Sequence, residues 1–172
     1  MGSTGAALVT GGAGFIGSTL ADALVAEGRE VHVLDDLSTG HRRNVPADAT
    51  LHRTDIRDAA AVAAAVVAAR PSTVFHLAAQ ADVRRAIADP AFDADVNING
   101  TLSVLEAARA VGARVVFAAT GGGAYGEYQG LPLPTPESAE PRPMSHYGQS
   151  KLAGEGYCAL YGRLYGVPTV RL

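Results

Sequence analysis

The chain has one cysteine, one lysine, no long apolar run and no concentration of positive charge. Because Cys158 stands alone, an internal disulfide is excluded, and the thiol suits a buried structural role in a reducing compartment. The longest purely apolar run, residues 59–69, is too short to span a bilayer. No charged-then-apolar leader precedes the first apolar run, so we expect a cytoplasmic protein.

The distribution of charge and histidine excludes further kinds of partner. The formal net charge is −3 and the basic residues are scattered, so we expect no nucleic-acid and no membrane surface. The five histidines show no ligand spacing, so we expect no metal site. With 172 residues, of which 48% are hydrophobic, the chain suits one domain, residues 1–172, with a sizeable core.

The only lysine, Lys151, stands four residues after Tyr147, and every other member of the Lys and Arg count is an arginine. On a helix this spacing places both side chains on one face. An ammonium is a compact point charge, and a positive charge beside a phenol favours the phenolate. The pair is therefore a candidate proton-transfer site, in which Tyr147 exchanges the proton.

A glycine-rich turn follows the first apolar run, residues 6–10. Gly11, Gly14 and Gly17 permit a tight turn and the close approach of a diphosphate, and the helix that follows offers free N–H groups and a favourable dipole. A second apolar run ends at Asp35, where a dinucleotide fold places its ribose-binding acid. Because a strand, a helix and this acid surround the turn, we interpret it as a dinucleotide-binding motif rather than an ordinary glycine-rich loop.

Strand and helix patterns alternate along the chain. Such alternation predicts an α/β protein with a parallel, doubly wound sheet and right-handed crossovers. Asp58 is expected to cap an alanine-rich helix, and the irregular stretch of residues 121–144, rich in glycine and proline, suits a functional loop. The expected strands lie near residues 6–10, 30–34, 50–53, 73–77, 114–119 and 168–172, and the expected helices near 14–27, 59–69, 91–111 and 145–165.

Six short motifs stand in a fixed order: residues 10–17 (TGGAGFIG), 34–35 (LD), 55–56 (DI), 76–79 (HLAA), 97–101 (NINGT) and 147–151 (YGQSK). In these motifs the chain resembles the extended short-chain dehydrogenases/reductases. Within them it is most similar to the NAD-dependent epimerase/dehydratase family, and there to the UDP-glucose 4-epimerase type. The resemblance implies a Rossmann domain with strand order 3-2-1-4-5-6, truncated after the sixth strand, with the family's C-terminal substrate domain absent.

The resemblance implies NAD as the cofactor. Asp35 would accept hydrogen bonds from the adenosine ribose, and Asp36 beside it, with no adjacent arginine, would repel a 2′-phosphate, which favours NAD over NADP. Asn97 is expected to be structural and to bond to the backbone of neighbouring strands. The other implied cofactor contacts are Gly11, Gly14, Phe15, Ile16 and Gly17 at the diphosphate, Asp55 and Ile56 at the adenine, Leu77, Ala78 and Ala79 along the cofactor, and Tyr147 and Lys151 at the nicotinamide ribose.

The same resemblance implies a transient oxidation of a nucleotide sugar, a UDP-hexose. Tyr147 would take the proton of a sugar hydroxyl while hydride passes to bound NAD, and hydride would return to the other face of the keto-sugar. Thr120 would be the hydroxyl donor, if the glycines after it are a one-residue insertion; otherwise it is an ordinary strand-end threonine. Related dehydratases carry acids after this threonine, whereas this chain has Gly121 and Gly122, which favours simple epimerisation.

Alternatives of other classes stay open. The chain is either the catalytic-residue part of such an epimerase, active only in a longer protein, or a non-catalytic dinucleotide-binding or dimerising module. A nucleotide-sugar dehydratase or a reductase of the same superfamily is a further alternative. Tyr157, Tyr161 and Tyr165 form a stripe that suits an interface or, alternatively, packing on the sheet. The family implies a homodimer through the helices near 91–111 and 145–165, with an isologous interface.

Overall fold

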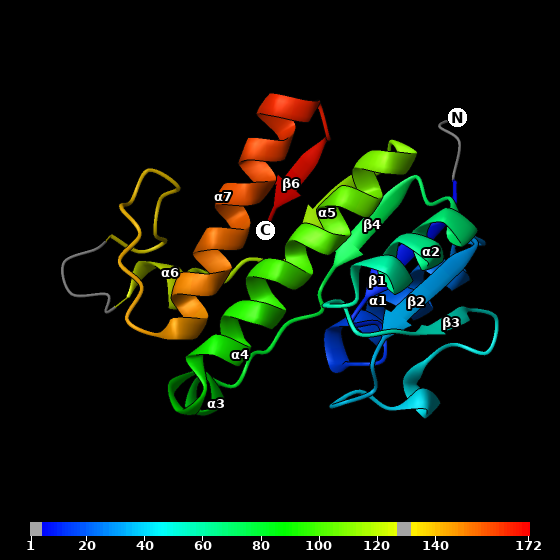
Figure 1. Ribbon diagram of the computed structural model, residues 1–172, viewed down its shortest axis with the longest axis horizontal. Coiled ribbons are helices and arrows are strands. Elements are labelled where there is room, and N and C mark those ends of the chain that lie inside the picture. The colour runs from blue at the N-terminus through cyan, green and yellow to red at the C-terminus, as the bar shows by residue number, and fades with distance from the viewer. Residues whose placement is uncertain (1–4, 127–131) are drawn as a thin grey trace.

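Six short parallel strands form the sheet at the centre of the molecule (Figure 1). The computed structural model describes residues 5–126 and 132–172. The strand order is β3-β2-β1-β4-β5-β6, so the predicted α/β fold class and the predicted Rossmann strand order are confirmed. The strands are β1 (Ala7–Thr10), β2 (Val31–Asp35), β3 (Thr50–Arg53), β4 (Thr73–His76), β5 (Arg114–Phe117) and β6 (Thr169–Arg171).

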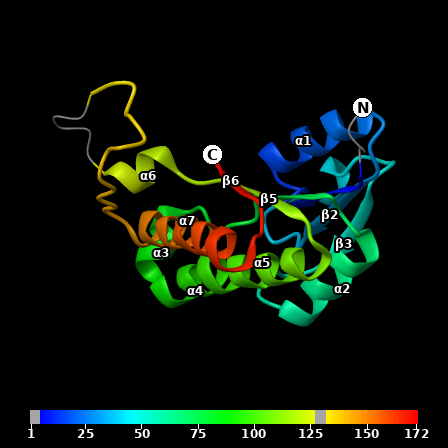
Figure 2. The same cartoon turned by 90° about the horizontal axis from the view of Figure 1, so that it is seen from above.

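The helices divide between the two faces of this sheet (Figure 2). Helix α1 lies on one face, whereas α2, α5 and α7 lie together on the other, with α5 between α2 and α7. The helices are α1 (Phe15–Ala26), α2 (Ala59–Ala69), α3 (Val83–Ala88), α4 (Pro90–Ala94), α5 (Gly100–Val111), α6 (Gly121–Tyr125) and α7 (His146–Tyr165), with a 3₁₀ turn η1 (Arg42–Asn44) and a π segment η2 (Asp95–Asn99).

Alternation along the central strands explains the two layers. Successive side chains point to opposite faces of a sheet, so Leu8 and Leu34 join the core under α2, α5 and α7, while Val9 and Val33 join the core under α1. Every residue of β1 and β2 is buried, as expected for parallel strands covered on both faces. The carboxyl ends of β1 and β4 lie side by side where the strand order reverses, which is where open α/β sheets bind ligands.

Hydrogen-bonded caps set the limits of several helices. The side chain of Asp58 accepts the N–H of Ala61 at 3.0 Å, which confirms the predicted cap of α2. Helix α3, which the sequence did not predict, begins at its cap Asp82. Asp89 ends α3 and caps α4, where Pro90 supplies a preset helical φ. The predicted helix over residues 91–111 is continuous in the structure from Pro90 to Val111, and its middle turn is a π segment, so it consists of α4, η2 and α5.

The stretch of residues 121–144 is not wholly irregular. Its first five residues form α6, because Thr120 caps them by accepting the N–H of Gly123 at 3.3 Å. Residues 127–131 lie outside the described residues, and residues 132–144 contain no helix or strand. Among the described helices, none is both long and apolar enough to cross a membrane.

Candidate functional site

The turn between β1 and α1 is shaped by the absence of side chains. Gly11 adopts φ +69°, and a Cβ on it would lie 2.7 Å from the amide nitrogen of Ala78. A Cβ on Gly17 would overlap the carbonyl oxygen of Gly11, so only glycine allows α1 to approach the turn so closely. Phe15 and Ile16 at the start of α1 are 89% and 67% exposed, which leaves the helix N-terminus open to a ligand.

A cavity of about 350 Å³ opens beside this turn, over the carboxyl ends of β1, β2 and β4. Most of the residues predicted to contact a cofactor meet in it. Its wall includes Gly11, Gly14, Asp35, Asp36, Asp55, Ile56, Leu77, Ala78 and Ala79. Phe15, Ile16, Gly17, Thr120, Tyr147 and Lys151 do not line this cavity.

Two adjacent carboxylates mark the end of β2. Asp35 is 7% exposed, and its two oxygens accept the N–H groups of Ala13 at 2.9 Å and Leu37 at 2.8 Å. These bonds fix the carboxylate against the glycine turn. Asp36 is exposed and accepts both the N–H and the hydroxyl of Ser38. Both acids line the cavity together with Gly11 and Gly14 of the turn.

The cavity is also lined by two arginines and a phenylalanine that the sequence reasoning missed, namely Arg57, Arg85 and Phe92. Arg57 donates to both oxygens of Asp55, with the closest contact at 2.6 Å, and this hydrogen bonding lowers the pKa of Asp55. The guanidinium carbons of Arg57 and Arg85 lie 5.0 and 4.0 Å from the centroid of the Phe92 ring. Arg57 follows the predicted Asp55–Ile56 pair by one residue, a signal that was present; Phe92 and Arg85 depend on the fold of α3 and α4.

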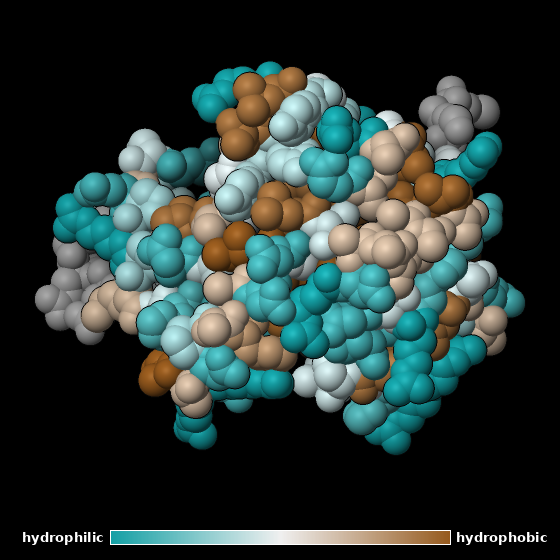
Figure 3. Space-filling model, in the orientation of Figure 1, coloured by the Kyte–Doolittle hydropathy of each residue, from teal (hydrophilic) through white to brown (hydrophobic). Residues whose placement is uncertain are grey.

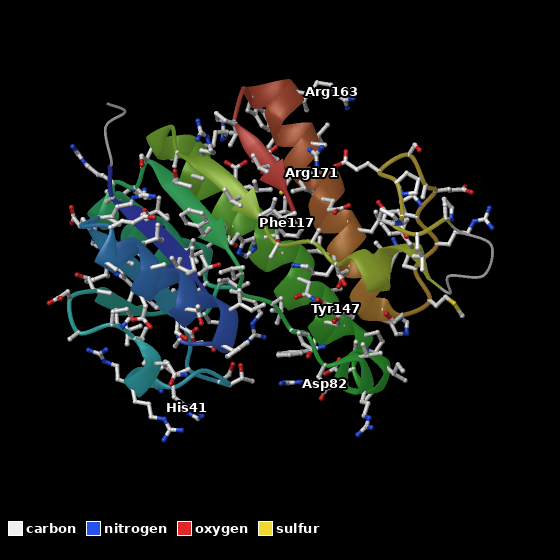
Figure 4. All side chains as sticks on the ribbon, turned by 180° about the vertical axis from the view of Figure 1, so that it is seen from behind. His41, Asp82, Phe117, Tyr147, Arg163 and Arg171 are labelled. Carbon is white, nitrogen blue, oxygen red and sulfur yellow. The ribbon has the colours of Figure 1, made fainter. Side chains whose placement is uncertain are left out.

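Helix α7 positions the Tyr147–Lys151 pair. Ser145 caps the helix by accepting the N–H of Gly148 at 3.0 Å, so Tyr147 lies in its first turn. Lys151, one turn later, is only 4% exposed, whereas Tyr147 is half-buried. Figure 4 shows Tyr147 near the start of α7 and Phe117 beside the middle of the helix, at the end of β5. The predicted pair thus lies at the carboxyl-end edge of the sheet.

Helix α6 packs against the start of α7. A Cβ on Gly148 would overlap the carbonyl oxygen of Gly123, so the two helices touch backbone to backbone. This contact brings Thr120, the cap of α6, to the same end of α7 as Tyr147. The hydroxyl of Thr120 already accepts the N–H of Gly123 as a cap, and its predicted donor role stays a prediction.

A buried polar network joins α7 to the wall of the cavity. Asn97 pairs with the backbone N–H and C=O of Gln80, both at 2.9 Å. Its amide nitrogen also lies 3.1 Å from Asp93 Oδ1 and 3.0 Å from Ser150 Oγ, and Ser150 in turn donates to the carbonyl of Tyr147. The expectation that Asn97 bonds to neighbouring strands is corrected, because its backbone partner is the loop after β4. The residue is structural, as predicted.

Burial dominates the electrostatics around Lys151. Loss of solvent lowers the pKa of Lys151 to about 8, and burial raises the pKa of the Cys158 thiol to about 11. Cys158 is fully buried, which confirms its predicted structural place. His76 is also fully buried, and burial lowers its pKa to about 3, with the charge of Lys151 as a second cause. At neutral pH the ammonium therefore lies among an uncharged thiol and an uncharged imidazole.

Comparison with known proteins places this geometry in context. Residues 7–172 match the model of the NAD dependent epimerase/dehydratase family. The chain is 42% identical over 161 residues to a putative UDP-glucose 4-epimerase of Methanocaldococcus jannaschii, with 93% of this chain and 52% of the relative covered. It is 44% identical over 163 residues to a UDP-glucose 4-epimerase of Mycolicibacterium smegmatis, with 92% and 51% covered.

Solved structures agree with these sequence relatives. The Thermus thermophilus UDP-glucose 4-epimerase in complex with NAD superposes with a TM-score of 0.91 at 47% identity, covering 96% of this chain and 53% of that one. The Thermotoga maritima UDP-glucose 4-epimerase with UDP-glucose gives 0.92 at 40% identity, covering 96% and 54%. The chain thus spans about half the length of the relatives that it matches.

Proposed function

This chain belongs to the NAD dependent epimerase/dehydratase family, and from that premise we propose that it carries the NAD site and the catalytic pair of a nucleotide-sugar 4-epimerase. The substrate class is a UDP-hexose of the UDP-glucose and UDP-galactose type. The observation that carries the proposal is the placement of the sole lysine, buried on α7 four residues after Tyr147, at the sheet edge that also holds the glycine turn.

The residues present fit NAD. The glycine turn excludes side chains where a diphosphate would lie, and the start of α1 offers unpaired N–H groups to its charge. Two backbone N–H groups hold the Asp35 carboxylate beside the turn, where it would accept hydrogen bonds from the ribose. A 2′-phosphate would meet both Asp35 and Asp36, so like-charge repulsion favours NAD over NADP.

The side chains of this chain would act as follows. Tyr147 removes and later returns the proton of the sugar C4 hydroxyl, and Lys151 supplies the positive charge that favours the phenolate. Thr120, at the same end of α7, donates a hydrogen bond to the reacting oxygen. When bound, NAD would supply the acceptor for the hydride that leaves C4, and this oxidation gives the transient 4-keto sugar. No carboxylate follows Thr120 among Gly121, Gly122 and Gly123, which favours epimerisation over elimination of water.

A second candidate function is a non-catalytic dinucleotide-binding or dimerising module. The observation behind this candidate is that the chain matches only about half the length of each relative. Under either function we propose a cytoplasmic homodimer through α5 and α7. The exposed side of these helices carries hydrophobic residues between hydrophilic ones (Figure 3), with Leu164 and Tyr165 59% and 52% exposed. Tyr161 instead packs inward, and its hydroxyl bonds to Glu106 on α5.

Calorimetry and turnover separate these functions. We expect NAD to bind this chain more tightly than NADP, and Asp35→Ala to weaken NAD binding by about 1–3 kcal/mol because hydrogen bonds to a charged acceptor are lost. Asp48→Ala, a change at an exposed acid away from the cavity, is the control. Interconversion of UDP-glucose and UDP-galactose by this chain or by a longer form supports the epimerase. NAD binding without turnover in both forms supports the module, and tighter binding of NADP contradicts the assignment of NAD as the cofactor.

A further inference from the structure

The Lys151 side chain is buried without a carboxylate partner for its ammonium. None of the ion pairs among residues 5–126 and 132–172 includes Lys151, although its side chain is 4% exposed. A buried charge without compensation is expensive, and such a group normally neutralises. The protein therefore needs another partner for the ammonium if Lys151 is to remain charged.

The face of an aromatic ring occupies that position. Nζ of Lys151 lies 4.1 Å from the centroid of the Phe117 ring, well inside the range of cation–π attraction, and Phe117 is fully buried. We propose that Phe117 is a positioning residue, whose ring face is the partner of the Lys151 ammonium and holds it charged at the start of α7. This inference rests on the proposed function, because it concerns the lysine whose charge is assigned there to favour the Tyr147 phenolate.

The ring is itself fixed from two sides. A Cβ on Gly154, three residues after Lys151, would lie 2.7 Å from Cζ of Phe117, so the glycine leaves room for the ring under α7. The His76 ring lies against Phe117, with centroids 5.6 Å apart and planes at 53°. Glycine at position 154 and the imidazole at position 76 thus determine where the ring face can be.

Hydrogen bonds determine the state of His76. The hydroxyl of Thr101 donates its proton to the carbonyl of Asn97 at 2.7 Å, so it must accept at 3.0 Å from Nε2–H of His76. Nδ1 then carries no proton and accepts from the hydroxyl of Thr10 at 2.7 Å. A neutral imidazole in this tautomer supports the ring without adding a second positive charge beside Lys151.

Few other charges act on Lys151. Glu155 and Cys158 of its own helix and His76 of β4 are the groups whose charges affect it, and Arg171 of β6 acts on Cys158. The thiol and the imidazole are neutral near pH 7, and Glu155 forms no ion pair with Lys151 among the described residues. The charge of Glu155 is therefore the alternative to the Phe117 ring as the group that stabilises the Lys151 ammonium, and it can be removed separately.

The single lysine makes the test direct. In protein labelled with ¹³C at lysine Cε, the only signal is that of Lys151, and its titration between about pH 6 and pH 11 gives the pKa of the ammonium without any assay of activity. The variants are Phe117→Leu, a series with fluorinated phenylalanines at position 117, which weaken the ring face while keeping its shape, and Glu155→Gln. Phe75→Leu is the control, since Phe75 is a partly buried strand residue on the other face of the sheet.

We expect the pKa of Lys151 to fall by about one unit in Phe117→Leu, tenfold in the protonation constant, and to fall stepwise along the fluorinated series. Phe75→Leu should leave it unchanged. If Phe117→Leu does not fold, the fluorinated series alone decides. An unchanged pKa across that series, or a fall only in Glu155→Gln, overturns the inference. A fall in the pKa together with no NAD binding and no turnover by the unmodified protein would contradict the proposed function instead.

Discussion

In the turn after β1, backbone atoms form the candidate site, whereas at the start of α7 buried side chains form it. Gly11 and Gly17 work by having no side chain, because a Cβ would meet the backbone of Ala78 at Gly11 and the backbone of Gly11 at Gly17. Lys151 depends on Phe117, and Phe117 on His76, which come from three separate elements. The first region is specified by steric fit, the second by the balance between burial and charge. The two regions should therefore fail in different ways when they are changed.

The largest expected effect separates chemistry from binding. In a form that turns over UDP-glucose, Tyr147→Phe should lower the rate about 10²–10⁴-fold, the usual contribution of an acid–base group, because the proton acceptor is removed. NAD should remain bound, as measured by calorimetry, since the change removes one hydroxyl and leaves the cavity wall intact. Tyr165→Phe, at an exposed ring on the same helix, serves as the control. A rate for Tyr147→Phe equal to the control would refute the assignment.

The next effect concerns the cost of burying the ammonium. The pKa of Lys151 is lowered from 10.5 to about 8, so the unfolded chain binds more protons between these values, and this group adds stability as the pH rises through that window. Below pH 8 the buried charge is a net cost. Lys151→Met should thus be about 3 kcal/mol more stable than the unmodified protein at pH 7 and about 1 kcal/mol more stable at pH 10.

Urea unfolding at a series of pH values measures this difference. Arg163→Met replaces an exposed cation on the same helix and should show no such pH dependence. If the two variants behave alike, Lys151 is not buried in the way described.

The glycine turn should fail through steric overlap instead. Gly17→Ala should destabilise the protein by about 3 kcal/mol, at the upper end for overpacking, because the obstacle is the carbonyl of Gly11 rather than a movable side chain. Gly156→Ala in α7, where a Cβ meets nothing within 4 Å, should instead stabilise by about 0.5–1 kcal/mol. Thermal unfolding of both variants tests the pair. Equal shifts in Tm would show that the turn tolerates a side chain.

The smallest effect belongs to His76. Its pKa is lowered from 6.5 to about 3 by burial, so its contribution to stability is complete above pH 6.5 and is lost as the pH falls toward 3. Relative to His76→Gln, the unmodified protein should lose about 2 kcal/mol of stability between pH 7 and pH 5. Urea unfolding of both proteins, with His41→Gln as an exposed control, measures it. A constant difference from pH 7 to pH 5 speaks against a neutral His76.

The same contrast explains what the sequence could predict. The strand order was predicted from motifs in short segments, and the structure confirms it. The predicted Gly11, Gly14, Asp35, Asp36 and Asp55 also meet in one cavity. Local patterns suffice there because a turn, a cap such as Asp58 and a strand end involve near neighbours. The partners of Lys151 could not be predicted, because Phe117 reaches it only once β5 and α7 have packed. Helix α6 was not predicted because the glycines of Gly121–Gly123 have low helix propensity. In the structure the helix begins at its cap, Thr120.

The π segment η2 between α4 and α5 determines which residues of this continuous helix lie on the same side. Asp93, Asn97, Thr101 and Leu105 are spaced four residues apart, and each is at most 2% exposed. In a regular α-helix each step of four overshoots a full turn by about 40°, so three steps would carry Leu105 about 120° off the face that Asp93 occupies. The π turn at Asp95–Asn99 has more residues per turn than an α-helix, with hydrogen bonds to the fifth residue. It therefore offsets this rotation and brings the four residues back to one side of the helix. If that turn became regular α-helix with all its residues kept, everything on one side of it would rotate, and Asp93 and Leu105 would no longer share one buried face.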